Sequence, residues 1–324
     1  MAKRYDPNDY LYASARIRAM ELRLTPAERW NQLLETRTAE DALTAFSEQG
    51  DTARPDPETL SEQAMREALA AIAASVPDPT LTHFIRYPYD CNNLKVLEKC
   101  RIKGTPPDEL FIDLGTVSVR SLQTVSENEL LQLLPKHMAA ALPMARDAFA
   151  RTADPREIDF ILDRAAFADM AEAAAPYPFA ARLVAVRADL TNLTMCLRLL
   201  RMKSGAVGRA VLEHALLTVG TLSDKELLDC YDGGEDAFFD AISKTPYANV
   251  YDRSASLSVV EKRADDYVMD IVRGARSVTF GAEIPIAYLL AIETEGKNLR
   301  ILLAGKAAGQ DRDTIKAKLR KNYV

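Results

Sequence analysis

The chain has 324 residues, enough for two or three ordinary domains and a substantial buried core. It carries 41 lysines and arginines against 47 aspartates and glutamates, a formal net charge of −6 that would repel the phosphate backbone of a nucleic acid. Hydrophobic residues make up 48% of the chain but aromatic residues only 7%, so the apolar side chains are mainly aliphatic and favour helices. We therefore expect an all-α protein that does not bind nucleic acid.

The sequence has no segment typical of export or membrane insertion. Its first ten residues include charges and no apolar leader core. The sequence contains no run of about 18 apolar residues, the length that a bilayer-spanning helix needs. The four cysteines have neither CxxC spacing nor a nearby pair of histidines, so they predict no zinc site and no disulfide framework. We expect a protein of the reducing cytosol that holds no metal or other cofactor.

Amphipathic helices are predicted almost throughout the chain. The first covers residues 9–24, where one apolar stripe recurs at steps of three and four. Comparable leucine stripes run through 190–200 and 299–303, whereas alternating strand-like patterns are short and rare. The first stripe consists of Tyr10, Ala13, Ile17, Met20 and Leu24. Clusters of Pro, Gly and Asp predict loops at 50–57, 76–79, 105–108, 176–178 and 231–235.

One short signature, an acid followed three residues later by Asn-Leu, occurs three times at intervals of roughly 100 residues. The copies are Asp90–Leu94, Asp189–Leu193 and Glu295–Leu299. We expect each copy to open a helical segment of about a dozen residues that closes on a glycine. The closing glycines are Gly104, Gly205 and Gly309.

A second signature keeps step with the first. Thr25–Glu28, Ser126–Glu129 and Ser223–Glu226 have the form of a capping box, in which a hydroxyl and a carboxylate three residues apart start a helix. Two signatures that recur together three times indicate three similar helical modules, each too small to bury its apolar face alone. The predicted modules are 1–115, 116–217 and 218–324.

Two interpretations of the acid and asparagine pairs remain open. In the structural interpretation, the acid favours a helix start and the Asn amide joins neighbouring helices by hydrogen bonds. In the functional interpretation, the six side chains lie on one surface around a pseudo-threefold axis and contact a partner. The pairs are Asp90 with Asn93, Asp189 with Asn192, and Glu295 with Asn298.

Groups that could support catalysis are few. His83, His137 and His214 lie far apart in the sequence and form no HExxH motif, so they predict no metal ligand or base. The segment at Lys306 resembles a phosphate-binding loop, but it lacks the first glycine of that motif and has Ala307 in place of the hydroxyl residue. We therefore expect no nucleotide site.

An acidic segment is the most enzyme-like feature of the sequence. Asp265, Asp266 and Asp270 resemble the aspartates with which all-helical prenyl-transfer enzymes hold magnesium and diphosphate, although their spacing is one residue longer than DDxxD. Neighbouring charges at 261–263 favour instead a solvated helix face. An all-helical Mg-dependent transferase remains one alternative function, and an unrelated helical scaffold is another.

Several segments resemble the C subunit of archaeal and bacterial V/A-type rotary ATPases, a family similar to the d subunit of the eukaryotic vacuolar enzyme. Tyr10–Glu21 resembles the opening helix of that family, and 90–95 and 189–193 resemble its internal segments. The C-terminal resemblance is the most specific. It rests on Phe280-Gly281, Ala287–Leu289, Glu295–Leu303 and the run from Ile315 to Val324.

The resemblance implies a funnel-like, pseudo-threefold, all-α molecule without catalytic residues. Such a protein belongs to the central stalk, as a socket that couples the D and F subunits of the rotating shaft to the membrane proteolipid ring during ATP-linked proton or sodium transport. It would lie in the cytoplasm, peripheral to the inner face of the membrane, without entering the bilayer. The six acid and asparagine residues would then be a tentative partner interface.

Overall fold

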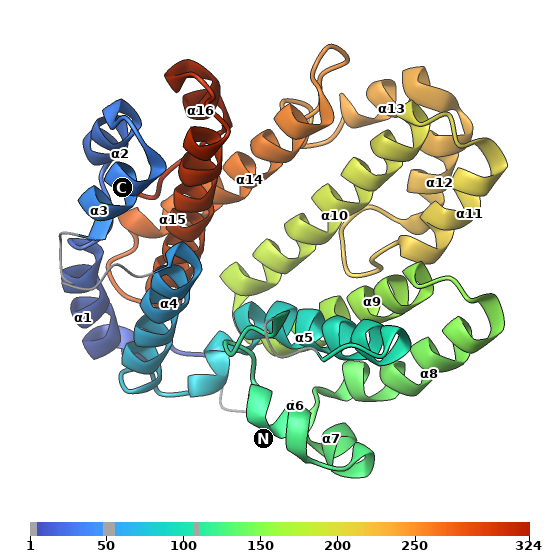
Figure 1. The fold of residues 1–324 in the computed structure, drawn as a ribbon, viewed down its shortest axis with the longest axis horizontal. Helices are drawn as coiled ribbons and strands as arrows, with labels where there is room; N and C mark the ends of the chain where they lie inside the picture. Colours follow the sequence, from blue (N-terminus) through green and yellow to red (C-terminus); the bar gives the residue numbers. More distant parts are fainter. Residues whose placement is uncertain (1–4, 48–55, 107–109) are drawn as a thin grey trace. The chain divides into compact units, whose positions relative to one another are not determined.

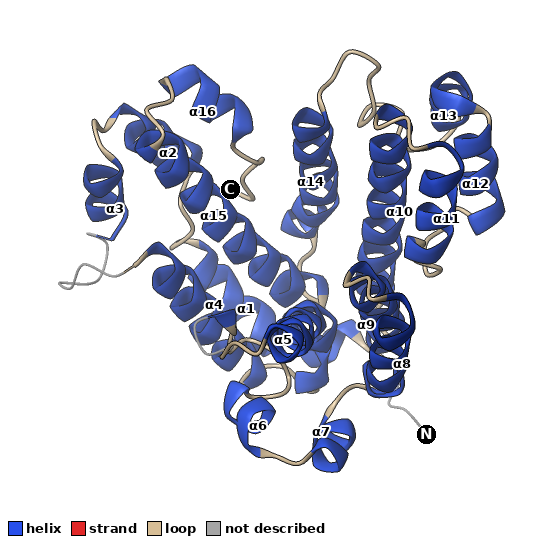
Figure 2. Ribbon diagram, turned by 45° about the vertical axis from the view of Figure 1, so that its right-hand side comes forward, coloured by secondary structure: helices blue, strands red, loops and turns tan. Residues whose placement is uncertain are grey.

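Every regular element of the structure is a helix. The computed structural model describes residues 5–47, 56–106 and 110–324, and no β-strand occurs in these ranges (Figure 2). The all-α prediction is confirmed. The predicted loops at 76–79 and 176–178 do interrupt the helices, and the one at 50–57 lies mostly outside the described residues.

Contacts within the chain divide it into two compact units. The first joins residues 1–79 with residues 258–324, so it draws on both the N-terminal and the C-terminal part of the sequence. Figure 1 labels the α-helices of this unit. Its elements are η1 (Pro7–Tyr10), α1 (Leu11–Glu21), α2 (Ala27–Glu35), α3 (Ala39–Ser47), α4 (Pro57–Ala73), α14 (Leu257–Arg273), η4 (Gly274–Ser277), α15 (Glu283–Ala307) and α16 (Arg312–Lys318).

Helix α15 is the centre of the first unit. Its sequence is apolar on nearly all sides, and its faces are buried because α1, α3, α4 and α16 pack against it. One apolar cluster joins Trp30 and Leu33 of α2 with Leu299 and Leu302 of α15 and Ile315 of α16. The helix therefore ties the N-terminal helices to the C-terminal ones.

The second unit is a continuous stretch, residues 80–257, that begins within the short helix η2 (Pro79–Thr82). Its helices are α5 (His83–Lys103), α6 (Val119–Thr124), α7 (Glu127–Leu133), α8 (Lys136–Thr152), α9 (Arg156–Ala174), α10 (Pro178–Arg201), α11 (Gly205–Ala215), α12 (Asp224–Asp232) and α13 (Gly234–Ile242).

Two packed groups of helices make up the second unit. Helices α5, α8 and α9 share an apolar core that includes Leu94, Met138 and Leu162. Helix α10 contacts α9 on one side and α11, α12 and α13 on others. Burial of side chains around α10 agrees with its leucine-rich sequence, because a helix surrounded by neighbours needs apolar residues on several faces.

The predicted N-terminal stripe forms the buried face of η1 and α1. Tyr10, Ala13 and Ile17 are at most 2% exposed. The α-helix is shorter than the predicted range, because a 3₁₀ turn capped by Asp6 precedes it and the chain leaves the helix before Leu24.

The predicted division into three modules, 1–115, 116–217 and 218–324, stays a prediction. Contacts group the chain into two units rather than three, because the N-terminal helices pack on α15. Among the described residues, no helix has the length and apolar content that crossing a bilayer requires.

Candidate functional site

Three buried asparagines each hold one residue of a distant segment by the same pair of hydrogen bonds. In each case the side-chain amide donates to a backbone carbonyl, and the side-chain oxygen accepts from the amide of the same residue. Such a pair satisfies both polar groups of a residue that has no regular backbone partner. The pairs are Asn93 with Ile112 (2.8 and 2.9 Å), Asn192 with Leu217 (2.9 and 2.9 Å) and Asn298 with Arg320 (3.0 and 2.8 Å).

The acid one helical turn before each asparagine accepts from a threonine. On α5, Asp90 accepts from the amide (2.9 Å) and hydroxyl (2.7 Å) of Thr116 and from the amide of Val117 (3.0 Å). A Cβ atom at Gly115 would lie 2.1 Å from the Asp90 carboxylate, so glycine lets the loop approach. Burial raises the pKa of Asp90, although these hydrogen bonds act to lower it. We call Asp90, Asn93 and the loop 112–117 the first joint.

The second joint repeats this arrangement on α10 with the loop 217–222. Asp189 accepts from the amide (2.9 Å) and hydroxyl (2.5 Å) of Thr221 and from the amide of Leu222 (3.1 Å). The Tyr247 hydroxyl donates a further bond of 2.7 Å. Here too a Cβ atom at Gly220 would lie 2.1 Å from the carboxylate. Two loops far apart in sequence thus meet their helices in the same way.

The third joint, on α15, is closed by two separate segments of the chain. Asn298 holds Arg320 of the C-terminal segment. Glu295 accepts from the amide and hydroxyl of Thr25, which lies in the turn between α1 and α2. Burial raises the pKa of Glu295 to about 7, and the two bonds from Thr25 oppose that shift.

The three joint helices also end in the same way. Eleven residues after each asparagine, one residue adopts a left-handed conformation: Gly104 (φ 66°), Lys203 (φ 53°) and Gly309 (φ 65°). The next amide bonds a carbonyl five residues back, at 3.1, 3.3 and 2.9 Å, which is the Schellman pattern. The predicted ends at Gly104 and Gly309 are confirmed. The predicted end at Gly205 is wrong, because Lys203 takes that place and Gly205 begins α11.

The prediction that each acid and asparagine signature lies at the start of a helix is wrong. Helix α5 begins at His83, seven residues before Asp90, and the other two signatures lie even deeper in α10 and α15. The acids therefore gain nothing from the helix N-terminus, whose influence is confined to the first turn. The asparagines instead form the hydrogen bonds that the structural interpretation expects, although to loops and a chain end rather than to helices.

The six predicted interface residues lie inside their units. Asp90, Asn93, Asp189, Asn192 and Asn298 are at most 2% exposed, and Glu295 is partly buried. Their polar groups bond to the chain itself. That these side chains contact a partner stays a prediction, and such a contact would require the joints to open.

Two of the three predicted capping boxes are confirmed. Ser126 with Glu129 starts α7, and Ser223 with Glu226 starts α12, each with both reciprocal hydrogen bonds. The box predicted at Thr25 is wrong, because Pro26 caps α2 without a side-chain bond. The Thr25 amide and hydroxyl are instead bound to Glu295.

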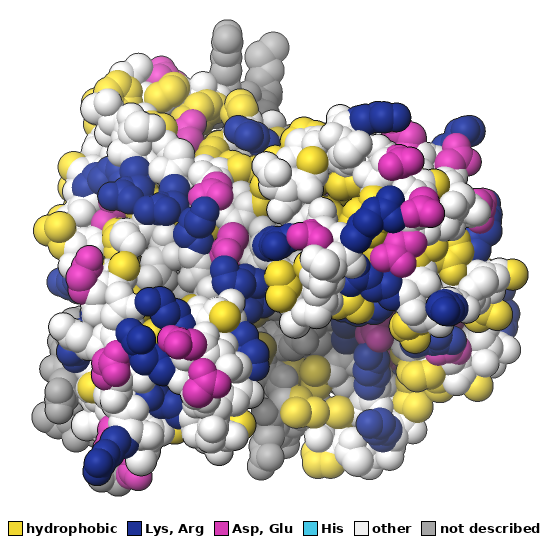
Figure 3. Space-filling view, turned by 90° about the horizontal axis from the view of Figure 1, so that it is seen from above, with side chains coloured by type: hydrophobic (Ala, Val, Ile, Leu, Met, Phe, Trp, Pro, Cys, Tyr) yellow, Lys and Arg dark blue, Asp and Glu magenta, His cyan; other side chains and the backbone are white. Residues whose placement is uncertain are grey.

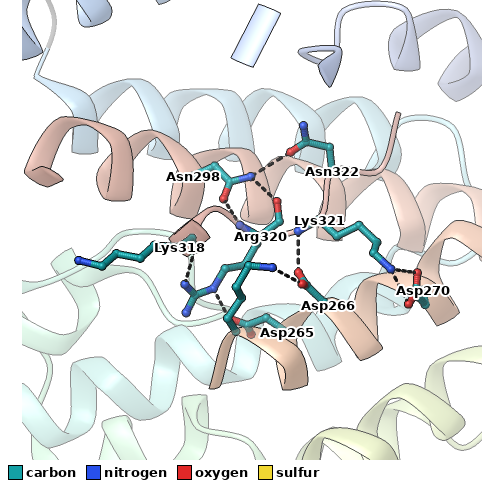
Figure 4. Close-up of polar contacts among 9 residues, drawn as sticks. Asp265, Asp266, Asp270, Asn298, Lys318, Arg320, Lys321 and Asn322 are labelled. Atoms are coloured by element: carbon teal, nitrogen blue, oxygen red, sulfur yellow. Dashed lines mark hydrogen bonds and ion pairs between the residues drawn. The ribbon is translucent and has the colours of Figure 1, made fainter. Parts of the chain in front are cut away.

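The acidic segment of α14 fastens the C-terminal residues, as Figure 4 shows. Those residues pass between Asn298 on one side and the three aspartates on the other. Burial acts to raise the pKa of Asp265, but Lys297 and Arg320 hold it below its usual value. The contacts are Asp265 with Arg320 (2.8 Å) and Lys297 (3.0 Å), Asp266 with the amide of Lys321 (2.6 Å), and Asp270 with the Lys321 ammonium (2.7 Å).

Each of the three aspartates therefore already has a partner within the chain. In the described part of the chain, no group of three or more His, Cys, Asp or Glu side chains is arranged to hold a metal ion. These contacts give no support to a magnesium and diphosphate site on α14.

Lys306 lies in the last turns of α15 rather than in a loop before a helix. Its ammonium donates to the carbonyls of Leu34 (3.1 Å) and Thr36 (2.5 Å) at the end of α2. Carbonyls at a helix C-terminus are otherwise unsatisfied, so the lysine caps α2. A phosphate loop would need free amides at a helix N-terminus, which this position lacks.

The remaining reactive side chains are scattered. His137 is 3.1 Å from Glu172, and His214 is 3.6 Å from Glu157. His83 packs against Tyr87, with ring centroids 5.7 Å apart. The four cysteines are free thiols, and three of them are buried. No two histidines share a partner among these contacts.

Sequence reasoning missed the segments that the joints hold. A signal for the first two exists, because 114–117 and 219–222 both have the order aliphatic, Gly, Thr, aliphatic. The third has no such signal. Its threonine and its acid are 270 residues apart, and its two segments come from opposite parts of the chain.

Comparison with known proteins gives matches along most of the chain. A family model described as ATP synthase (C/AC39) subunit matches residues 13–318. The C subunit of the V-type sodium ATPase of Enterococcus hirae is 25% identical over 325 residues, covering 95% of this chain and 97% of that protein. The C subunits of the A-type ATP synthases of Methanocaldococcus jannaschii and Thermococcus onnurineus are 23% and 22% identical, covering 96% and 92% of this chain and 86% of each relative.

Proposed function

The chain belongs to the ATP synthase (C/AC39) subunit family, and from this premise we propose that it is the central-stalk socket of a V/A-type rotary ATPase. In this role it couples the D and F subunits of the shaft to the proteolipid ring at the cytoplasmic face of the membrane, without entering the bilayer. It carries no catalytic residue. ATP hydrolysis and ion translocation belong to other subunits of the complex.

The extent of the similarity carries this proposal. The relative from Enterococcus hirae is aligned over 97% of its length, so the resemblance covers a whole protein rather than a shared motif. The name of that relative says that it is part of a sodium ATPase. The names of the archaeal relatives place them in ATP synthases. An accessory component common to both machines fits a mechanical role better than a chemical one.

The joints support a mechanical role. A protein that transmits torque must deform little under load, and closely packed interiors have low compressibility. Each joint adds several hydrogen bonds between a buried helix and a loop or chain end, in an interior where such bonds are strong. Within each unit, the joints therefore resist the sliding of helices past the segments that connect them.

The side chains that could have formed a chemical site already make contacts within the chain, and this also supports the proposal. Lys306 caps α2, and Asp265, Asp266 and Asp270 hold the C-terminal segment.

On the face that Figure 3 shows, basic and acidic side chains are interspersed rather than separated into large fields. Because the joints are interior, partners would meet the outer faces of the helices that the joints fix.

Co-purification tests the proposal. A tagged copy, extracted from membranes in mild detergent, is expected to bring down the proteolipid ring and the shaft proteins. A matched tagged variant, Asn192→Leu, removes the side chain that holds the second joint and is expected to recover less of both. Recovery of the wild-type chain alone, under conditions in which the ring and shaft remain together, would contradict the proposed role.

A further inference from the structure

The third joint differs from the other two in its chemistry. Among the described residues, its glutamate accepts only from Thr25, whereas Asp90 and Asp189 each accept from two or more residues. This acid bonds a residue 270 positions away, whereas the other two acids bond residues 26 to 58 positions away. Loss of the hydrogen bonds between Glu295 and Thr25 would free the turn between α1 and α2 from α15.

In the part of the chain that the structure describes, the Glu295 carboxyl has no cation in direct contact, although the Arg23 side chain lies near the neighbouring Tyr288. No ion pair within the described residues includes Glu295. The space beside it, lined by Leu24, Ala291 and Tyr323 among others, is too small for a water molecule. The ionisable side chains around this region are Glu21 of α1, Arg23 of the turn 22–26, Glu67 of α4, Tyr288 of α15 and Tyr323 of the C-terminal segment.

We propose that the Glu295–Thr25 contact of the third joint is a proton-dependent latch, closed while the Glu295 carboxyl is protonated and opened locally when it ionises. An ionised carboxylate that is largely removed from water and has no paired cation is costly, and two hydrogen bonds from one residue offset only part of that cost. Opening lets water reach the charge. The moving part is the turn 22–26, because the apolar contacts of Trp30 and Leu33 hold α2 in place independently.

The direction of the pH dependence follows from linkage. Burial raises the pKa of Glu295 from its ordinary value of 4.5 to about 7, so the closed state binds the proton more tightly than the open state. Raising the pH from 4.5 to 7 therefore favours opening. Between pH 6 and pH 8, the equilibrium constant for opening should rise about tenfold.

Hydrogen exchange of single amides in the full chain measures this opening. The Thr25 amide donates to Glu295, and its protection factor, corrected for intrinsic exchange, should fall about tenfold between pH 6 and pH 8. The Arg320 amide is an internal control, because it donates to the neutral side chain of Asn298 on the same helix. Its protection factor should stay constant.

Two variants separate Glu295 from its neighbours. Glu295→Gln removes the charge but keeps an acceptor for Thr25, so the protection factor of Thr25 should become independent of pH. Glu293→Gln removes another acid of α15 and should keep the wild-type response. The proposal is overturned if the wild-type Thr25 amide shows no pH dependence, if the response survives in Glu295→Gln, or if it also disappears in Glu293→Gln.

If Glu295→Gln does not fold, the protection factors of the wild-type chain between pH 6 and pH 8 still test the proposal. A fall in protection at Thr25 without a fall at Arg320 supports the latch, and parallel behaviour of the two amides contradicts it. The proposal concerns the chain alone, so it does not depend on the proposed role in a rotary ATPase.

Discussion

At the scale of single residues, the asparagines contribute more than the sequence pattern suggests. Each satisfies the amide and the carbonyl of one residue outside regular structure, and these groups would otherwise be buried without partners. The identity of the six residues could be predicted from their repetition. Their environment could not, because the sequence upstream of each signature also forms helix and moves the acid and asparagine into the middle of a long, buried element.

Replacing Asn192 by leucine should destabilise the chain by about 3 kcal/mol, because the buried amide and carbonyl of Leu217 lose their partner. The exposed neighbour Thr191 provides a control, and Thr191→Ala should change stability by less than about 0.5 kcal/mol. Urea unfolding followed by circular dichroism measures both. Equal effects of the two substitutions would show that the second joint adds nothing to folding.

At the scale of elements, the helix ends repeat more faithfully than the sequence does. Glycine marks two of the three left-handed ends, and this signal was predictable. The third could not be predicted, because Lys203 adopts that conformation while Gly205 stands two residues further on. In α10 the left-handed position is therefore occupied by a residue that does not favour it.

Lys203→Gly should therefore stabilise the chain by about 1 kcal/mol, since a left-handed conformation costs a side chain of L configuration about that much. Gly104→Ala at the matching position of α5 should destabilise it by a similar amount. Thermal unfolding of both variants and of the wild-type chain measures whether the melting temperature rises for the first variant and falls for the second. A lower melting temperature for Lys203→Gly would mean that the lysine side chain itself stabilises the helix end.

The C-terminal segment should make the chain sensitive to acid. The pKa of Asp265 is lowered by Lys297 and Arg320, so its ionised form stabilises the fold above pH 3.8, and this contribution is lost as the pH falls through the lowered pKa. Asp265→Asn should reduce stability at pH 7 more than Asp270→Asn does, because the Asp270 side chain is 55% exposed and its ion pair is screened by solvent. The difference should vanish at the lowest pH. A difference that persists there would exclude the ion pairs as its cause.

At the scale of the whole molecule, the joints follow a cyclic order along the chain. Thr116 and Thr221 each close the joint of the acid that precedes them, and the last acid, Glu295, returns to Thr25 near the start. This order supports the proposal of three similar modules. The three-part repetition could be predicted from sequence, but the return to Thr25 could not, because nothing in a linear sequence indicates which distant threonine meets the last acid.

Reconstituted ion transport is the most direct test of the proposed coupling role. Membranes that contain the rotary ATPase but lack this chain should retain ATP hydrolysis by the catalytic head and lose ATP-driven ion transport. Adding the purified chain should restore transport. Transport that proceeds equally well without the chain, or that the purified chain fails to restore, would contradict the account.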